Sequence, residues 1–155
     1  MFQMFQFKEP QILGSEDCLW INVYTPSSIS NEEKLRPVLV WIYGGRFLVG
    51  TASSKIYSPD FMLDHDLVVV SIQYRVGPYG FLSTGDSVAP GNYGFHDQVL
   101  ALKWVKANIE KFGGDPDQVS AYLLFSSQNF RIPIVISYRR TFLQLVLIFY
   151  LQGPP

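Results

Sequence analysis

Two consecutive glycines, Gly44 and Gly45, follow an unbroken apolar run over residues 37–43, PVLVWIY. Glycines at the end of a strand let the backbone approach a ligand closely and present N–H groups with no Cβ in the way. Such donors can stabilise the negative charge that develops on a carbonyl oxygen during acyl transfer, an effect of roughly 3–4 kcal/mol per donor. The same pair is also compatible with a plain turn, so the surrounding sequence must decide between the two interpretations.

The other groups with catalytic or ligand-binding chemistry are few. Cys18 is the single cysteine, which excludes an intramolecular disulfide framework and a CxxC metal site. Its thiol is either inert and buried or half of a bridge whose partner lies outside this chain. The histidines His65 and His96 lie in a polar turn and near a helix start, and we interpret both as solvated surface residues. We therefore expect no metal site and no cofactor.

The composition excludes several classes of protein. The 155 residues are 48% hydrophobic and 16% charged, with 12 Phe, 9 Tyr and 3 Trp, which excludes an intrinsically disordered chain. The net charge is -1 and no basic stripe is visible, so we expect no nucleic-acid partner. No apolar run reaches the roughly 20 residues that span a bilayer. The first residues, MFQMFQFKEP, lack the features of a secretory signal, and we assign no compartment.

The elements that would position the glycine pair are strands and one long helix. Strands are predicted over 19–24, 37–43, 67–74 and 118–124, and an amphipathic helix over 97–112. Gly113 and Gly114 would end the helix, and Asp115-Pro116 would form a turn. Two of the strands are unbroken apolar runs, which are typical of a sheet covered on both faces. This order predicts an α/β fold with a mixed, mostly parallel central sheet.

Four motifs follow one another at close spacing: SEDCLWINVYTP (15–26), PVLVWIYGGRF (37–47), VVVSIQYRVGPYGFLSTGD (68–86) and APGNYGFHDQVLALKWVKANIEKFGGDPDQV (89–119). Together they closely resemble the carboxylesterase/cholinesterase (type B) branch of the α/β-hydrolase family. The resemblance covers about residues 15–122. It implies a partial α/β-hydrolase fold, the N-terminal part of the central sheet with its helices, truncated before the nucleophile elbow. It also implies a small ester as the substrate of the full-length family.

The resemblance gives the glycine loop a role. Gly44, Gly45 and Arg46 correspond to the loop whose backbone N–H groups form the oxyanion hole, where this branch usually has three glycines. The donor is a backbone N–H, so it is retained when arginine replaces glycine at position 46. The long cationic side chain of Arg46 would crowd the acyl site and impair hydrolysis of bulky esters, or it would attract anions. An arginine would also strain the loop if the backbone there needs a positive φ.

Three further residues take structural roles from the resemblance. Arg75 and Asp97 correspond to an ion pair between a strand end and the long helix. Cys18 corresponds to half of a disulfide whose partner lies upstream, in sequence that this chain does not contain. That pairing implies an oxidising, secretory compartment for a full-length relative.

The nucleophile is where the sequence departs most from the family. After a strand such as QVSAY, the family continues into a Gly-x-Ser-x-Gly elbow, whose glycines permit the sharp turn that exposes the serine. Here residues 123–127 read LLFSS, so Phe125 occupies the place of the nucleophile and neither glycine is present. Ser126 and Ser127 have no such turn to expose them. Because residues 126–155 also contain no Asp, Glu or His, we assign no catalytic residue.

We interpret residues 1–122 as the N-terminal part of a type B carboxylesterase domain and residues 123–155 as a divergent apolar tail. The tail's apolar runs, 132–136 and 142–151, would form strands or a short helix. A parallel sheet cut before the tail would keep an open edge. Three hypotheses follow: a truncated carboxylesterase-like protein without catalysis, a non-catalytic cholinesterase-like module for protein recognition, and, least favoured, an esterase that uses Ser126 or Ser127.

Overall fold

The computed structural model describes residues 15–26, 34–127, 130–139 and 142–147, with side chains described as far as Leu123. Within these residues six strands form one sheet in the order β1-β3-β2-β4-β5-β6. The strands are β1 (Ile21–Tyr24), β2 (Arg36–Ile42), β3 (Val68–Ile72), β4 (Gly114–Ser127), β5 (Phe130–Arg139) and β6 (Phe142–Leu147). The central strands β3, β2 and β4 are parallel, whereas β1, β5 and β6 each run antiparallel to their neighbour.

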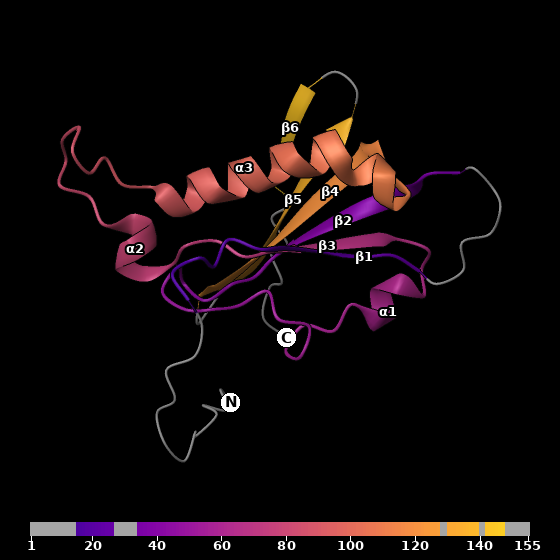
Figure 1. Ribbon diagram of the computed structural model, residues 1–155, viewed down its shortest axis with the longest axis horizontal. Helices are drawn as coiled ribbons and strands as arrows, with labels where there is room; N and C mark the ends of the chain where they lie inside the picture. Colours follow the sequence, from indigo (N-terminus) through magenta and orange to yellow (C-terminus); the bar gives the residue numbers. More distant parts are fainter. Residues whose placement is uncertain (1–14, 27–33, 128–129, 140–141, 148–155) are drawn as a thin grey trace, which may run out of the picture.

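Helices lie on both sides of this sheet (Figure 1). The long helix α3 (Tyr93–Asn108) continues into a 3-10 turn, η1 (Ile109–Phe112), and crosses one face, while the short α1 (Asp60–Leu63) lies on the other. A second short helix, α2 (Gly77–Phe81), precedes α3. Every residue of β3 is buried and four of the five are apolar, as is typical of a strand covered on both faces. The predicted mixed α/β sheet with helices is therefore confirmed.

The predicted helix over 97–112 is confirmed, but it begins four residues earlier, at Tyr93. Its first turn contains Gly94, where a Cβ would lie 2.4 Å from the carbonyl oxygen of Arg75, so this turn packs directly on the backbone after β3. The spacing of apolar residues cannot reveal a helical turn that packs closely because glycine has no side chain. At the other end Gly113 has φ 78, the left-handed conformation that ends a helix, as predicted.

The predicted turn at Asp115-Pro116 is a bulge inside β4. The ladder between β2 and β4 pairs Arg36 with Gly114 and then Val38 with Val119, so the intervening residues of β4 leave the regular register. The side chain of Asp115 accepts a hydrogen bond from the backbone N–H of Asp117 at 2.8 Å, the local contact of an Asx turn. The predicted turn contact of Asp115 is therefore present, but it lies within β4 and not before the strand.

The tail adds strands to the sheet, so β4 is an inner strand of the described sheet. β5 pairs antiparallel with β4 from Val119 opposite Tyr138 to Ser127 opposite Phe130, and β6 pairs with β5 in turn. The run over 132–136 forms strand within β5, so its backbone groups take up the hydrogen bonds that β4 would have left open. Among the described residues, β6 is therefore the last strand on this side of the sheet.

Candidate functional site

The glycine loop follows β2 at its carboxyl end, the edge of a parallel sheet where α/β proteins bind ligands. Gly45 has φ 141, and a Cβ at this position would lie 1.8 Å from the carbonyl oxygen of Val49. That close approach closes a tight turn, because the N–H groups of Leu48 and Val49 donate to the Gly45 carbonyl at 3.0 and 3.2 Å. Glycine is therefore required at position 45.

Backbone N–H groups of this loop lack an acceptor among the described residues. Within the described part of the chain, the backbone N–H groups of Gly45 and Arg46 donate to no acceptor. Arg46 has φ 58 and Phe47 has φ 61, so two residues with side chains are held in the left-handed region. The Arg46 side chain is exposed. The loop thus does need a positive φ where the arginine stands, and it holds unused donors at a strand end.

A buried tyrosine pair anchors the start of this loop. The hydroxyl of Tyr43 donates to the carbonyl of Tyr74, and the hydroxyl of Tyr74 donates to the carbonyl of Tyr43, each at 2.9 Å. The two rings stack with centroids 4.5 Å apart, and both residues are at most 1% exposed. Burial raises the pKa of Tyr43 to about 12 and raises that of Tyr74 as well. The carboxyl ends of β2 and β3 are therefore joined through two neutral phenols.

A polar network continues from this pair to the segment after the loop. Gln73 donates through Nε2 to the Tyr43 hydroxyl at 2.9 Å and accepts from the backbone N–H of Ala52 at 2.9 Å. The Ala52 carbonyl accepts from Asn22 of β1 at 3.3 Å and from Ser71 of β3 at 3.2 Å. Both ends of the glycine loop are thus fixed to the sheet by side chains that the sequence patterns did not single out.

An aromatic cluster fixes the loop from the side of the helices. The Phe47 ring lies 5.1 Å from that of Phe81 in α2 and 5.4 Å from that of Phe95 in α3. Phe81 and Phe95 are themselves 5.3 Å apart and nearly perpendicular, at 85°. The Phe47 carbonyl also accepts a hydrogen bond from Gly77 at 2.6 Å. The strained φ of Phe47 is therefore held by packing against two helices.

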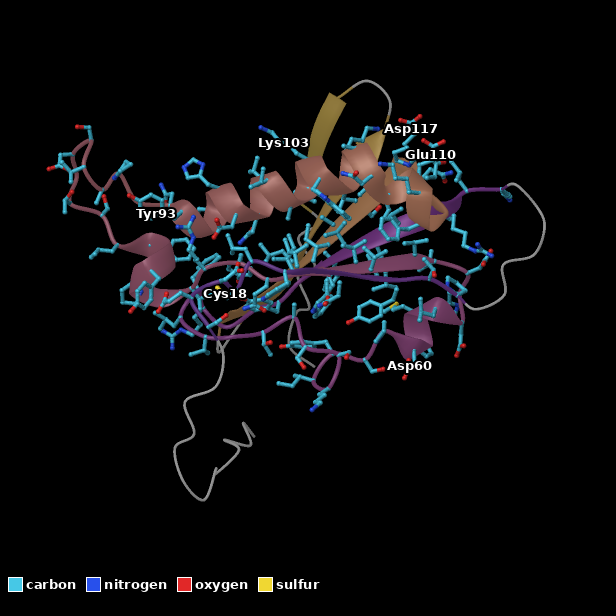
Figure 2. The ribbon with its side chains drawn as sticks, viewed as in Figure 1. Cys18, Asp60, Tyr93, Lys103, Glu110 and Asp117 are labelled. Atoms are coloured by element: carbon cyan, nitrogen blue, oxygen red, sulfur yellow. The ribbon has the colours of Figure 1, made fainter. Side chains whose placement is uncertain are left out.

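Arg75 and Asp97 are brought together at the start of α3. Asp97 accepts from the Arg75 guanidinium through Nε at 2.8 Å and Nη2 at 2.7 Å, and from its backbone N–H at 3.1 Å. Burial alone would raise the pKa of Asp97, but the hydrogen bonds and charge of Arg75 outweigh it and lower the pKa below 3.8. The ring of Tyr93, at the N-terminal end of α3 in Figure 2, lies 5.3 Å from the guanidinium carbon.

The position expected for a nucleophile lies on a continuous strand. Residues 123–127 belong to β4, with Leu123 opposite Ile42 of β2 and Phe125 opposite Ile132 of β5. The backbone makes no elbow there, because pairing with β5 continues to Ser127. Ser127 and the neighbouring Ser126 lie in the part of β4 whose side chains are outside the described residues.

The two histidines lie away from this strand. Both His65 and His96 are exposed, as expected for solvated residues. His65 packs edge-on against Phe61 of α1, with centroids 5.0 Å apart. Within the described residues, neither histidine donates a hydrogen bond to a carboxylate.

Comparison with known proteins decides the family. A family model described as the carboxylesterase family matches residues 2–122, more than two thirds of the chain. The chain belongs to the carboxylesterase family. It is 46% identical over 116 residues to bile salt-activated lipase of Bos taurus, covering 70% of this chain and 19% of that protein. It is 47% identical over 116 residues to juvenile hormone esterase of Tribolium castaneum, covering 75% of this chain and 19% of that protein.

A third carboxylesterase relative shows how the match is distributed. Carboxylesterase 3B of Mus musculus is 53% identical over 108 residues, covering 70% of this chain and 19% of that protein. The chain therefore spans about a fifth of the length of the curated relatives that it matches. The glycine loop, the tyrosine pair and the ion pair of Arg75 all lie within the residues that the family model matches, while β5 and β6 lie beyond them.

The remaining side chain singled out from the sequence, Cys18, has a free thiol and is half-buried. It lies at the same end of the sheet as Tyr93, opposite to Glu110 and Asp117 (Figure 2). It lines a polar depression with Asp17, Asn22 and Gln73 among other residues. Across the described ranges, no three His, Cys, Asp or Glu side chains are grouped to hold a metal ion. No helix in those ranges has both the length and the apolar character to cross a membrane.

Proposed function

We propose that this chain carries the oxyanion-loop part of the carboxylesterase scaffold and does not itself hydrolyse esters. The observation that carries the proposal is the course of β4, which runs as a paired strand through residues 123–127. A serine becomes nucleophilic only when a bend presents its hydroxyl to a base that can take the proton. Phe125 stands where the family has its serine, and no glycine of this segment allows the bend.

Gly44, Gly45 and Arg46 are proposed as the residues equivalent to the oxyanion hole. The support is their place at the carboxyl end of β2 and the N–H groups of Gly45 and Arg46, which donate to no acceptor among the described residues. In a complete serine esterase such donors would stabilise the oxyanion of a small carboxylic ester during acyl transfer. We extend the proposal to the division of the chain, with residues 1–122 as the family part and 123–155 as the divergent tail.

Esterase assays with a serine-directed probe test this proposal. The 155-residue polypeptide is incubated with p-nitrophenyl acetate and p-nitrophenyl butyrate, and separately with a fluorophosphonate, with an active serine esterase as the positive control. We expect the esters to be hydrolysed no faster than in buffer alone, and we expect no labelling of the chain by the fluorophosphonate. Variants Ser126→Ala and Ser127→Ala serve as matched controls for background chemistry. Saturable turnover or probe labelling that either substitution removes would overturn the proposal.

A role in protein recognition without catalysis is the second candidate. It is favoured by exposed apolar side chains around a groove of about 160 Å³ between the start of β1 and α3. Trp20 is 61% exposed and Leu100 is 65% exposed there, with Leu19 and Trp104 beside them. A monomeric chain that unfolds cooperatively and lacks activity would favour this role, whereas insoluble material would favour an incomplete esterase scaffold.

A further inference from the structure

The side chain of Arg46 is a cation that the described part of the chain does not use. Arg46 is exposed, and neither a hydrogen bond nor an ion pair joins its guanidinium to a described residue. The residue is also held at φ 58, a backbone conformation that costs free energy for an arginine and not for a glycine. A strained residue whose charge is not used within the fold is a candidate for binding an outside group. A guanidinium presents a planar fork of N–H donors that matches a carboxylate.

Two backbone donors lie beside this side chain. The N–H groups of Gly45 and Arg46 donate to no acceptor among the described residues. The turn that carries them is fixed on both sides, because Tyr43 exchanges hydrogen bonds with Tyr74 and Phe47 packs against α2 and α3. Donors that are already held in place lose little conformational entropy when a ligand binds.

Two apolar side chains follow these donors in the same turn. Leu48 is 62% exposed and Val49 is 67% exposed. Their N–H groups donate to the Gly45 carbonyl at 3.0 and 3.2 Å, so a fixed backbone presents both side chains to solvent. One exposed apolar residue is ordinary on a protein surface, but this pair adjoins a cation and backbone N–H donors that lack an acceptor. Charge complementarity together with apolar contact favours an anion that carries an alkyl chain.

We propose that the glycine loop binds the carboxylate of an aliphatic acid, with the guanidinium of Arg46 selecting the anion. One carboxylate oxygen accepts from the N–H groups of Gly45 and Arg46, the other accepts from the guanidinium, and the alkyl chain lies on Leu48 and Val49. The inference rests on the proposed function, because beside a working serine these donors would instead stabilise the oxyanion of acyl transfer. A glycine at position 46 would supply the backbone N–H and no cation.

Calorimetric titration with sodium octanoate, kept below the concentration at which it forms micelles, tests the binding. Sodium acetate lacks the alkyl chain and octan-1-ol lacks the charge, and we expect each to bind at least about tenfold more weakly than octanoate. Arg46→Gly keeps the backbone donors and relieves the positive φ, so it should fold and lower the octanoate affinity roughly three- to tenfold. Lys103→Gln is the matched control, because it removes an exposed positive charge from α3 (Figure 2) and should leave the affinity unchanged. Equal affinities in these two variants, or equal binding of octanoate and octan-1-ol, would overturn the proposal.

Amide NMR of the same titration locates the anion. The amide protons of Gly45 and Arg46 should move downfield as octanoate is added, because they become hydrogen-bonded to a carboxylate. The amide of Gly85, in an exposed loop, should not move. Octanoate binding that leaves the Gly45 and Arg46 amides unmoved would place the ligand elsewhere and refute the inference. Hydrolysis of p-nitrophenyl esters by a chain that also binds octanoate through Arg46 would count against the proposed function alone, whereas a chain that shows neither would count against this inference alone.

Discussion

Removing the carboxylate of Asp97 should destabilise the fold more than removing any exposed carboxylate. Asp97 is 8% exposed and accepts three hydrogen bonds from Arg75, two of them from the guanidinium. Through them the end of β3 is tied to the first turns of α3. In Asp97→Ala, the guanidinium and the backbone N–H of Arg75 lose their acceptor at a position that is shielded from water.

The magnitude follows from the unequal burial of the two partners. Breaking a fully buried ion pair by removing one partner costs about 3–5 kcal/mol, because the remaining charge is left unpaired. The Arg75 side chain is 38% exposed, so water recovers part of that loss. We therefore expect Asp97→Ala to lower the free energy of unfolding by about 2–4 kcal/mol. Asp97→Asn, which keeps an acceptor for the backbone N–H, should cost less.

Urea unfolding followed by tryptophan fluorescence measures this difference. Asp117→Ala is the matched control, because Asp117 pairs with Lys106 at 2.8 Å but both side chains are more than a third exposed. That variant should lose no more than about 1 kcal/mol. Equal losses in the two variants would refute the assigned role of the Arg75 pair.

The pH dependence gives a second measure of the same pair. The pKa of Asp97 is lowered in the folded chain, so its contribution is complete above the unfolded value of about 3.9 and is lost as the pH falls further. The unfolding midpoint of the native chain should therefore fall more steeply below pH 4 than that of Asp97→Asn. Parallel profiles would contradict this assignment.

Three further substitutions probe the glycine loop and its anchor. Gly50 has φ 143, and Gly50→Ala places a Cβ about 2.2 Å from the Tyr43 ring, so this variant should lose at least about 2 kcal/mol of unfolding free energy in urea. Gly85→Ala is the control: its Cβ would meet no atom within 4 Å, so it should lose only the backbone strain of about 1 kcal/mol. Arg46→Gly releases an arginine held at φ 58 and should raise the free energy of unfolding by about 1 kcal/mol; an unchanged midpoint would show that the loop is not strained. Tyr43→Phe leaves the Tyr74 carbonyl without its donor and should cost about 1–3 kcal/mol. Because the folded pKa of Tyr43 is about 12, the Tyr43 hydroxyl contributes its full stabilisation below pH 10 and loses it between pH 10 and 12. Absorbance at 295 nm would follow its ionisation, and urea unfolding at each pH would follow the loss of stability.

The strands and the long helix could be predicted because their signals are local. Four of the five residues of β3 are apolar because both of its faces are covered. In α3 and η1, Ala101, Val105 and Ile109 recur every four residues on the buried side, whereas Val99 and Leu100 of the same helix are exposed. Glycines that only stop an element, such as Gly113, were also readable. The start of α3 could not be predicted, because Gly94 allows the first turn to pack on the Arg75 backbone by having no side chain.

The anchors of the candidate site could not be predicted, since they join residues far apart in sequence. Tyr43 and Tyr74 exchange hydrogen bonds across 31 positions, and either tyrosine alone reads as an ordinary strand-end aromatic. The arrangement of the tail could not be predicted for a related reason. Its apolar runs predicted strands or a short helix, but only the pairing partner shows that β5 lies beside β4 and that β6 lies beside β5.

The long separation between β2 and β4 determines when the centre of the sheet can close during synthesis. Val38 pairs with Val68 soon after both are made, yet its other neighbour, Val119, lies roughly 80 residues further along. At translation rates of about 5–20 residues per second, one side of β2 waits roughly 4–16 seconds for its partner. The ribosome-bound nascent chain therefore passes through a stage in which β2, a central strand with three buried apolar residues, is paired on one side alone, and chaperone capture at that stage would affect the yield of folded product.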